Sequence, residues 1–103
     1  MIDFQVERKR DPVRVRVSGD LTFGTVEELR EKLLKTMPRK GTFRLVLTDI
    51  GEFDLPGVQL LYSLCRSGES GTVTIEIDPG EAAPRIEKML RFAGLAPISC
   101  IQS

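Results

Sequence analysis

Four segments of the chain alternate apolar and polar residues with a period of two, the pattern of a strand that buries one face. The first runs from Ile2 to Val6, with acidic and amide residues between the apolar ones. The apolar positions of the other three are Val13, Val15 and Val17, then Phe43, Leu45 and Leu47, then Val73, Ile75 and Ile77. The sequence therefore predicts four half-buried strands.

A helix is predicted to begin at Thr25, directly after a loop that contains Gly24. Glu28 follows three residues later, so the two side chains can form a capping box at the helix start. Pro38 marks the end of this helix, because proline cannot continue a helical hydrogen-bond ladder. The apolar face comprises Val26, Leu29, Leu33 and Met37, with Leu34 beside it.

Two more helices are predicted, one before and one after the fourth strand in the sequence. One runs from Pro56 to Ser67 and ends at Gly68. The other ends at Gly94, which is suited to the left-handed conformation after a helix C-terminus. Its inward-facing residues are Ile86, Met89, Leu90 and Ala93. Residues 95–103 are predicted to form a short tail.

The order of elements is β-β-α-β-α-β-α, which predicts an α/β domain with a mixed four-stranded sheet. A helical crossover joins the second strand to the third and the third to the fourth, so these pairs should be parallel. Parallel strands that are covered on both faces normally read as continuous apolar runs. Because these strands alternate, we expect the helices mainly on one face of the sheet and a partly wet opposite face.

Composition narrows the class of protein. A chain of 103 residues predicts a single domain, 1–103. Fifteen basic residues balance fifteen acidic ones, so no net field favours nucleic acid or anionic lipid. The N-terminus does not have the pattern of a signal peptide, and no apolar run approaches the ~20 residues of a membrane-spanning helix. We therefore expect a cytoplasmic protein that does not insert into membranes.

The sequence lacks the combinations of residues that common catalytic and metal sites require. There is no histidine, and Cys65 and Cys100 are isolated, so neither a zinc site nor a disulfide framework is indicated. Serine hydrolase chemistry lacks an activating base, and no glycine-rich phosphate loop is present. Asp20, Asp49 and Asp54 follow predicted strands, as in a response-regulator receiver, but no matching lysine follows the fourth strand. We expect a non-catalytic protein without cofactor or metal.

Four stretches of the sequence carry a resemblance to a known family. They are Val17-Ser18-Gly19-Asp20-Leu21-Thr22, Thr25-Val26-Glu27-Glu28-Leu29, Leu45-Val46-Leu47-Thr48-Asp49 and Asp54-Leu55-Pro56-Gly57-Val58-Gln59-Leu60-Leu61. In this order and spacing the chain resembles a STAS domain, which occurs in sulfate transporters and bacterial anti-sigma factor antagonists. The similarity extends to Leu90–Leu95. The run Gly57–Leu61 is most similar to small stand-alone STAS proteins encoded near chemotaxis genes or lipid-transport ATPases.

The resemblance implies a cytoplasmic regulatory module that docks on a protein partner and performs no chemistry itself. In the antagonist branch, the partner is a serine kinase that also holds a sigma factor. That kinase phosphorylates a serine or threonine directly before the glycine that matches Gly57. Here the position is Pro56, and its neighbour Leu55 also lacks a hydroxyl. The resemblance therefore implies docking without control by that phosphorylation.

The start of the second helix is the predicted docking site. Proline disfavours the helical conformation in the residue before it, so Leu55 is predicted as the cap and Pro56 as the first helical residue. Asp54 would then stabilise the positive end of the helix dipole. Apolar residues surround most of this helix, so Leu60 and Leu64 either pack against neighbouring helices or face a partner. The predicted partner-binding residues are Asp20, Thr22, Phe23, Asp54, Leu55, Pro56, Gly57, Gln59, Leu60 and Leu64.

Several functions agree with this pattern. The first is an antagonist-type regulator that binds an anti-sigma factor or kinase-like protein. The second is an accessory subunit of a transport or chemotaxis-associated complex. A third is a sensor that encloses a small nucleotide or lipid between the sheet and the helix entrance. A homodimer, built on the wet sheet face or on the open edge near Ile2–Val6, is a further interpretation.

Overall fold

The computed structural model describes residues 2–8, 12–69 and 71–101. The elements follow the predicted order β-β-α-β-α-β-α, with one short 3-10 turn, η1, before the last helix. Their bounds are β1 Ile2–Arg8, β2 Val13–Leu21, α1 Val26–Thr36, β3 Gly41–Phe53, α2 Leu55–Glu69, β4 Val73–Asp78, η1 Gly80–Ala82 and α3 Ala83–Phe92.

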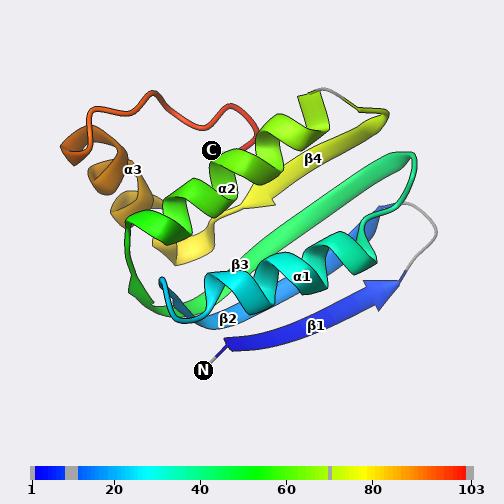
Figure 1. Ribbon diagram of the computed structural model, residues 1–103, viewed down its shortest axis with the longest axis horizontal. Coiled ribbons are helices and arrows are strands. Elements are labelled where there is room, and N and C mark those ends of the chain that lie inside the picture. The colour runs from blue at the N-terminus through cyan, green and yellow to red at the C-terminus, as the bar shows by residue number, and fades with distance from the viewer. Residues whose placement is uncertain (1, 9–11, 70, 102–103) are drawn as a thin grey trace.

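The strands form one four-stranded sheet in the order β1-β2-β3-β4 (Figure 1). β1 pairs with β2 in the antiparallel sense, and both remaining pairs are parallel. This topology confirms the predicted mixed sheet and its parallel crossovers. It also brings the C-terminal ends of β2 and β3, and the segments that follow them, to the same edge of the molecule.

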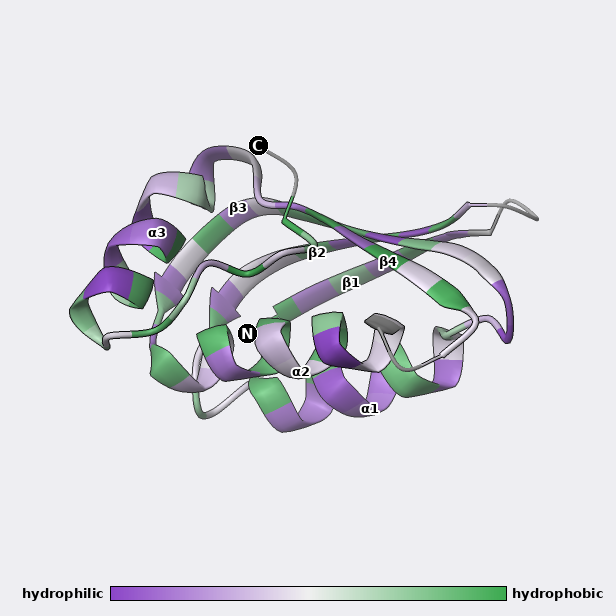
Figure 2. Cartoon of the chain, turned by 90° about the horizontal axis from the view of Figure 1, so that it is seen from above, coloured by the Kyte–Doolittle hydropathy of each residue, from purple (hydrophilic) through white to green (hydrophobic). Residues whose placement is uncertain are grey.

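The two faces of the sheet have different surroundings. Helices α1 and α2 lie side by side on one face, and α3 lies at the end of the sheet beside η1 (Figures 1 and 2). The inward-facing side chains of β2, β3 and β4 are almost completely buried beneath α1 and α2. No helix in the described part of the chain is long and apolar enough to cross a membrane.

The opposite face of the sheet carries a charged row across all four strands. Glu7, Arg14, Arg44 and Glu76 are neighbours in register from β1 to β4. A Glu7 carboxylate oxygen lies 3.8 Å from a guanidinium nitrogen of Arg14, and a guanidinium nitrogen of Arg44 lies 3.2 Å from a Glu76 carboxylate oxygen. Acidic and arginine side chains of β1 and β2 therefore attract each other on a face that α1 and α2 do not cover.

The start of α1 differs from the prediction. Thr25 is the N-cap residue, but its side chain makes no capping hydrogen bond to the helix, so the predicted capping box with Glu28 does not form. The Thr25 hydroxyl instead bonds to the loop that precedes it. On the apolar face, Leu29 and Leu33 are buried, whereas Leu34 is 64% exposed.

Strands β2 and β3 are longer than the period-two pattern indicated. The alternating pattern of the third strand stops at Leu47, and residues Asp49–Glu52 after it were expected to form a loop. They belong to β3, where Ile50 pairs with Gly19 and Phe53 pairs with Leu21. The alternation is lost there because the register shifts on both sides of Gly19 and because Asp49 adopts φ 48°. These extensions carry the two strands up to the segments that form the candidate site.

The segment after α3, predicted to be a short tail, packs against the core and pairs with β4. Gly94 adopts φ 69°, as expected after a helix C-terminus, but Ala93 is exposed, in contrast to the prediction. Ile98 is buried in the core, and Ile101 forms a parallel bridge with Ile77 of β4. A single inward-pointing isoleucine in a short segment gives no periodic pattern. The sequence therefore could not indicate that the C-terminal segment packs against the core.

Candidate functional site

The candidate site lies where the end of β2 meets the start of α2. β2 ends at Leu21, and the Asp54 N–H donates to the Leu21 carbonyl over 3.3 Å, which joins the two segments directly. The loop at 20–25, which contains three of the predicted partner-binding residues, therefore adjoins the start of α2. Residues more than thirty positions apart in the chain form one continuous surface here.

Asp54 holds both segments through its carboxylate. Oδ1 accepts from the Gly57 N–H at 3.3 Å, which is the bond of an N-cap side chain to the first turn of a helix. Oδ2 accepts from the Phe23 N–H at 3.1 Å. One side chain thus caps α2 and fixes the loop that carries Phe23.

The predicted cap was wrong by one residue. Asp54 is the N-cap, α2 begins at Leu55, and Pro56 is the second helical residue. Proline remains acceptable there because the first four backbone N–H groups of a helix have no partner within it. Aspartate's strong preference for the N-cap position outweighed the restriction that Pro56 places on Leu55.

Asp20 makes the reciprocal contact from β2 to β3. Its Oδ1 accepts from the Glu52 N–H at 2.9 Å, so each strand end sends one carboxylate to the backbone of the other segment. Gly51 makes this approach possible, because a Cβ there would lie 2.5 Å from Asp20 Oδ1. We call Asp20 and Asp54 together the aspartate clamp.

The aspartate clamp is not arranged as a receiver-type acidic pocket. The Asp20 and Asp54 carboxylates each accept a backbone N–H, while Asp49 is exposed on β3. Across the described ranges, no group of three or more cysteine or acidic side chains is placed to share a metal ion. Asp20 and Asp54 therefore hold the local backbone, and the bond from Asp54 to the first turn of α2 agrees with its predicted role at the helix start.

The loop between β2 and α1 is braced internally by Thr25. The Thr25 hydroxyl donates to the Asp20 carbonyl at 2.7 Å, and its oxygen accepts from the Thr22 N–H at 3.0 Å. The Thr22 carbonyl in turn accepts from the Thr25 and Val26 N–H groups. These bonds fix the loop from both sides of Phe23, so the exposed aromatic ring stands on an ordered backbone.

Phe23 and Leu55 are the exposed apolar residues of the site. Phe23 is 80% exposed and Leu55 is 41% exposed. Gln59 is also exposed, and Thr22 and Pro56 are half-buried. We call these five residues the loop–helix surface.

Gly57 is buried and lies beneath this surface. A Cβ at this position would approach the Leu21 carbonyl oxygen more closely than real Cβ atoms do, so glycine lets the first turn of α2 rest on the end of β2. Its predicted role as a partner contact is not supported by its burial. Its place in the structure is to permit close packing of the backbone.

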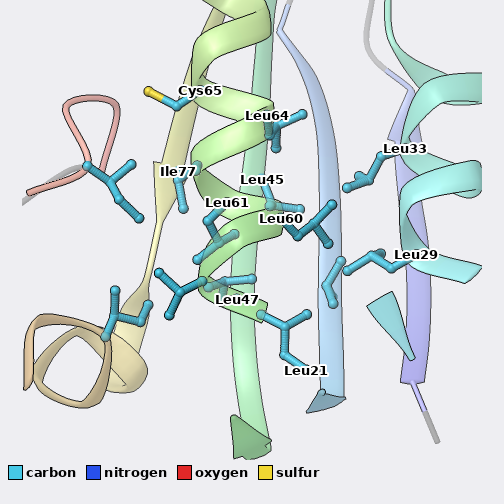
Figure 3. Close-up of a cluster of buried hydrophobic side chains, with 14 of the residues drawn as sticks. Leu21, Leu29, Leu33, Leu45, Leu47, Leu60, Leu61, Leu64, Cys65 and Ile77 are labelled. Atoms are coloured by element: carbon cyan, nitrogen blue, oxygen red, sulfur yellow. The ribbon is translucent and has the colours of Figure 1, made fainter. Parts of the chain in front are cut away.

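Leu60 and Leu64 are core residues, which corrects their prediction as partner contacts. Leu60 is 9% exposed and Leu64 is 7% exposed. Figure 3 shows both side chains projecting from α2 toward the side on which Leu29 and Leu33 of α1 lie. Of the two interpretations of the apolar excess on this helix, packing against a neighbouring helix is the one observed.

The sequence pattern predicted residues on both sides of this junction but not the hydrogen bonds that connect them. The Asp54 carboxylate bonds to Phe23, 31 positions away, and to Gly57, three positions away. Only the bond to Gly57 can be recognised from a local sequence pattern. That pattern is an aspartate three residues before a backbone N–H at the start of an apolar helix. The bond from Asp20 to Glu52 depends on the pairing of β2 with β3, which no local pattern reveals.

Comparison with known proteins agrees with this fold. No curated protein sequence matches the chain. The protein-family model described as "Mlab, STAS domain" matches residues 4–99. Among solved structures, the unphosphorylated form of the anti-sigma factor antagonist SpoIIAA matches with a TM-score of 0.68 and 23% identity, over 97% of this chain and 86% of that one. Because the family model spans nearly the whole sequence, this protein belongs to the STAS domain family.

Proposed function

We propose that this protein is a non-catalytic STAS-type interaction module that binds a protein partner through the loop–helix surface. Its proposed role resembles that of an anti-sigma factor antagonist, with an anti-sigma factor or a kinase-like regulator as the partner. The observation that carries the proposal is the exposure of Phe23 and Leu55 on a backbone fixed by the aspartate clamp.

An exposed aromatic residue on an ordered backbone is well suited to binding. Aromatic side chains are enriched among the residues that dominate interface energies. Ordering a loop on association costs free energy, and the bonds of Asp54 and Thr25 have already ordered this one. Phe23 can therefore enter a pocket of the partner with little loss of backbone entropy.

The surface has no phosphorylatable hydroxyl at the position where the resemblance implies one. Pro56 occupies it, and Leu55 precedes it. A phosphate in the first turn of α2 would bring nearly two negative charges to the Asp54 carboxylate. Without an acceptor there, docking is not switched by phosphorylation of this residue.

The charged sheet face is a poorer candidate for self-association. In a two-fold homodimer whose sheets overlap completely, face to face and with aligned strands, β1 lies over either β1 or β4 of the second copy. Glu7 then meets an acidic strand in both arrangements, and the arginines of β2 and β3 meet arginines. Like charges in direct opposition are destabilising, so the loop–helix surface is the better docking site.

An accessory subunit of a larger complex is the second candidate function. The family model that matches the chain is described by the name Mlab, whereas the matching solved structure is an anti-sigma factor antagonist. The resemblance to small stand-alone STAS proteins encoded beside lipid-transport ATPases or chemotaxis genes points the same way. In this role, the loop–helix surface would contact another subunit permanently.

A matched pair of phenylalanine variants tests the proposal. Phe23 and Phe92 are both highly exposed, at 80% and 91%, but only Phe23 belongs to the loop–helix surface. Tagged Phe23→Ser and Phe92→Ser proteins are used to capture partners from the native cell. We expect Phe23→Ser to lose a protein that the wild type and Phe92→Ser both retain, with the melting temperatures unchanged. Equal capture by all three proteins would contradict the proposal.

A further inference from the structure

A groove of about 320 Å³ lies between α1 and α2, apart from the loop–helix surface. It reaches from the middle of the two helices to the region where α1 ends and β4 begins. Its apolar wall includes Leu33, Leu34 and Met37 from the α1 side, Leu60 and Leu64 from α2, and Val73 and Ile75 from β4. The helix–helix packing that buries Leu60 and Leu64 therefore leaves an open apolar channel above them.

Leu34 stands at the exposed side of this groove. It is 64% exposed, although it lies on a helix whose neighbouring apolar residues Leu29 and Leu33 are buried. A large apolar side chain in this position exposes surface that a ligand in the groove would remove from water. The groove thus has a buried base and an apolar side chain beside its opening.

Among the described residues that line the groove, the charged ones are arginines. Arg30 lies in α1, and Arg39 follows the end of that helix. Both are exposed, and the described residues of the lining include no aspartate or glutamate. Within the part of the chain that the structure describes, neither guanidinium has a carboxylate within ion-pair distance. Two unpaired cations beside an apolar channel complement a ligand with an anionic head and an apolar body.

We infer that the groove binds one single-chain amphiphile with an anionic head group, such as the carboxylate of a medium-chain acyl compound. The acyl chain lies along Leu33, Leu60 and Leu64, and the head group meets Arg30 or Arg39. The volume is at the lower end of the range for small-molecule sites, which accommodates one chain and is too small for a two-chain lipid.

The surface beside the groove favours an individual molecule over a bilayer. Glu27 and Glu31 are exposed on α1, one turn apart and next to the row that contains Arg30 and Leu34. An anionic membrane surface would bring its head groups against these carboxylates and be repelled. A single amphiphile needs contact only with the groove and its arginines.

The test uses decanoate as the probe, kept below its micelle concentration, with amide shifts of the isotope-labelled protein as the readout. We expect saturable shifts that cluster at residues 33–39 and 60–67. Decyltrimethylammonium carries the same chain with the opposite charge and should bind at least about tenfold more weakly. Acetate supplies the head group alone and should cause no clustered shifts at the same concentrations.

Variants separate the groove from other binding modes. Arg39→Glu and Arg30→Glu change exposed residues, so both should fold, and each should weaken decanoate binding by about fivefold to tenfold. Arg91→Glu, an equivalent exposed change on α3, should leave the affinity unchanged. Equal affinity for the cationic amphiphile would overturn the inference. So would shifts centred on Phe23 and Leu55, or a concentration-dependent dimer in place of saturable binding. None of these results depends on whether the loop–helix surface binds a protein.

Discussion

The start and the middle of α2 carry apolar residues of similar size, yet they are used differently. At the start, Leu55 is 41% exposed beside Phe23 at 80%. In the middle, Leu60, Leu61 and Leu64 are all in the core, although they are leucines on the same helix. The difference comes from the neighbours: the middle has α1 on one side and β4 beneath it, whereas the first turn projects beyond α1 next to a loop.

The comparison shows why an apolar excess on a helix does not identify a binding surface. Hydrophobic periodicity counts apolar positions around the helix but gives no information on how many sides have neighbours. α2 is covered on more than one side, so a nearly continuous apolar circumference is core packing. The exposed apolar residues are instead at the junction of α2 with the loop, where bonds from Asp54 fix the backbone.

The largest expected effect is in the middle of α2. Leu60→Ala should lower the free energy of unfolding by about 2–4 kcal/mol, because it removes buried methyl groups and leaves a cavity. Leu34→Ala makes the same chemical change at a 64% exposed position and should cost less than about 0.5 kcal/mol. Urea denaturation measures both. Similar losses for the two variants would contradict the assignment of Leu60 to the core.

The close approach of α2 to β2 is tested by Gly57→Ala. A Cβ at Gly57 would clash with the Leu21 carbonyl, and one of the two backbones would have to move. We expect a net loss of about 2 kcal/mol after the better helix propensity of alanine is included. Gly24→Ala is the control, because its Cβ would have no neighbour nearer than 3.9 Å and should change stability little. If Gly57→Ala leaves the free energy of unfolding unchanged, the first turn of α2 does not pack closely on β2 and the prediction is wrong.

The smallest of the three effects is expected at the aspartate clamp. Asp54→Ala removes the cap and the bond to the Phe23 N–H, which should cost about 1 kcal/mol. Asp54→Asn keeps an oxygen acceptor and should retain most of that stability. Hydrogen exchange at the Phe23 and Gly57 amides should accelerate in the alanine variant more than elsewhere in the chain. Uniform acceleration would indicate a global effect without a local clamp.

Most of the architecture could be predicted because the strands and helices carry regular periodic patterns. The alternation in β2 and β3 placed Val15, Val17, Leu45 and Leu47 in the core, where the structure has them. The same alternation predicted one wet sheet face, now seen as the charged row from Glu7 to Glu76. Gly94 was correctly predicted to end α3 because its left-handed conformation is a local requirement.

The features that escaped prediction depend on contacts between distant segments. Asp49–Glu52 was predicted as a loop because pairing with the irregular end of β2 breaks the alternation. The buried position of Ile98 depends on the C-terminal segment running beside β4. At the candidate site, the exposed Phe23 and Leu55 were among the predicted contacts, but Leu60 and Leu64 were included because α1 could not be placed beside them.

The most direct test of the central claim is site-specific photo-crosslinking in the native cell. A benzophenone analogue of phenylalanine is placed at Phe23 in one protein and at Phe92 in another, since both positions are exposed and aromatic. If the loop–helix surface docks a partner, the analogue at Phe23 gives a discrete covalent adduct with one protein and the analogue at Phe92 does not. An adduct at Phe92 alone, or the same weak background at both positions, would contradict the claim that this surface is the docking site.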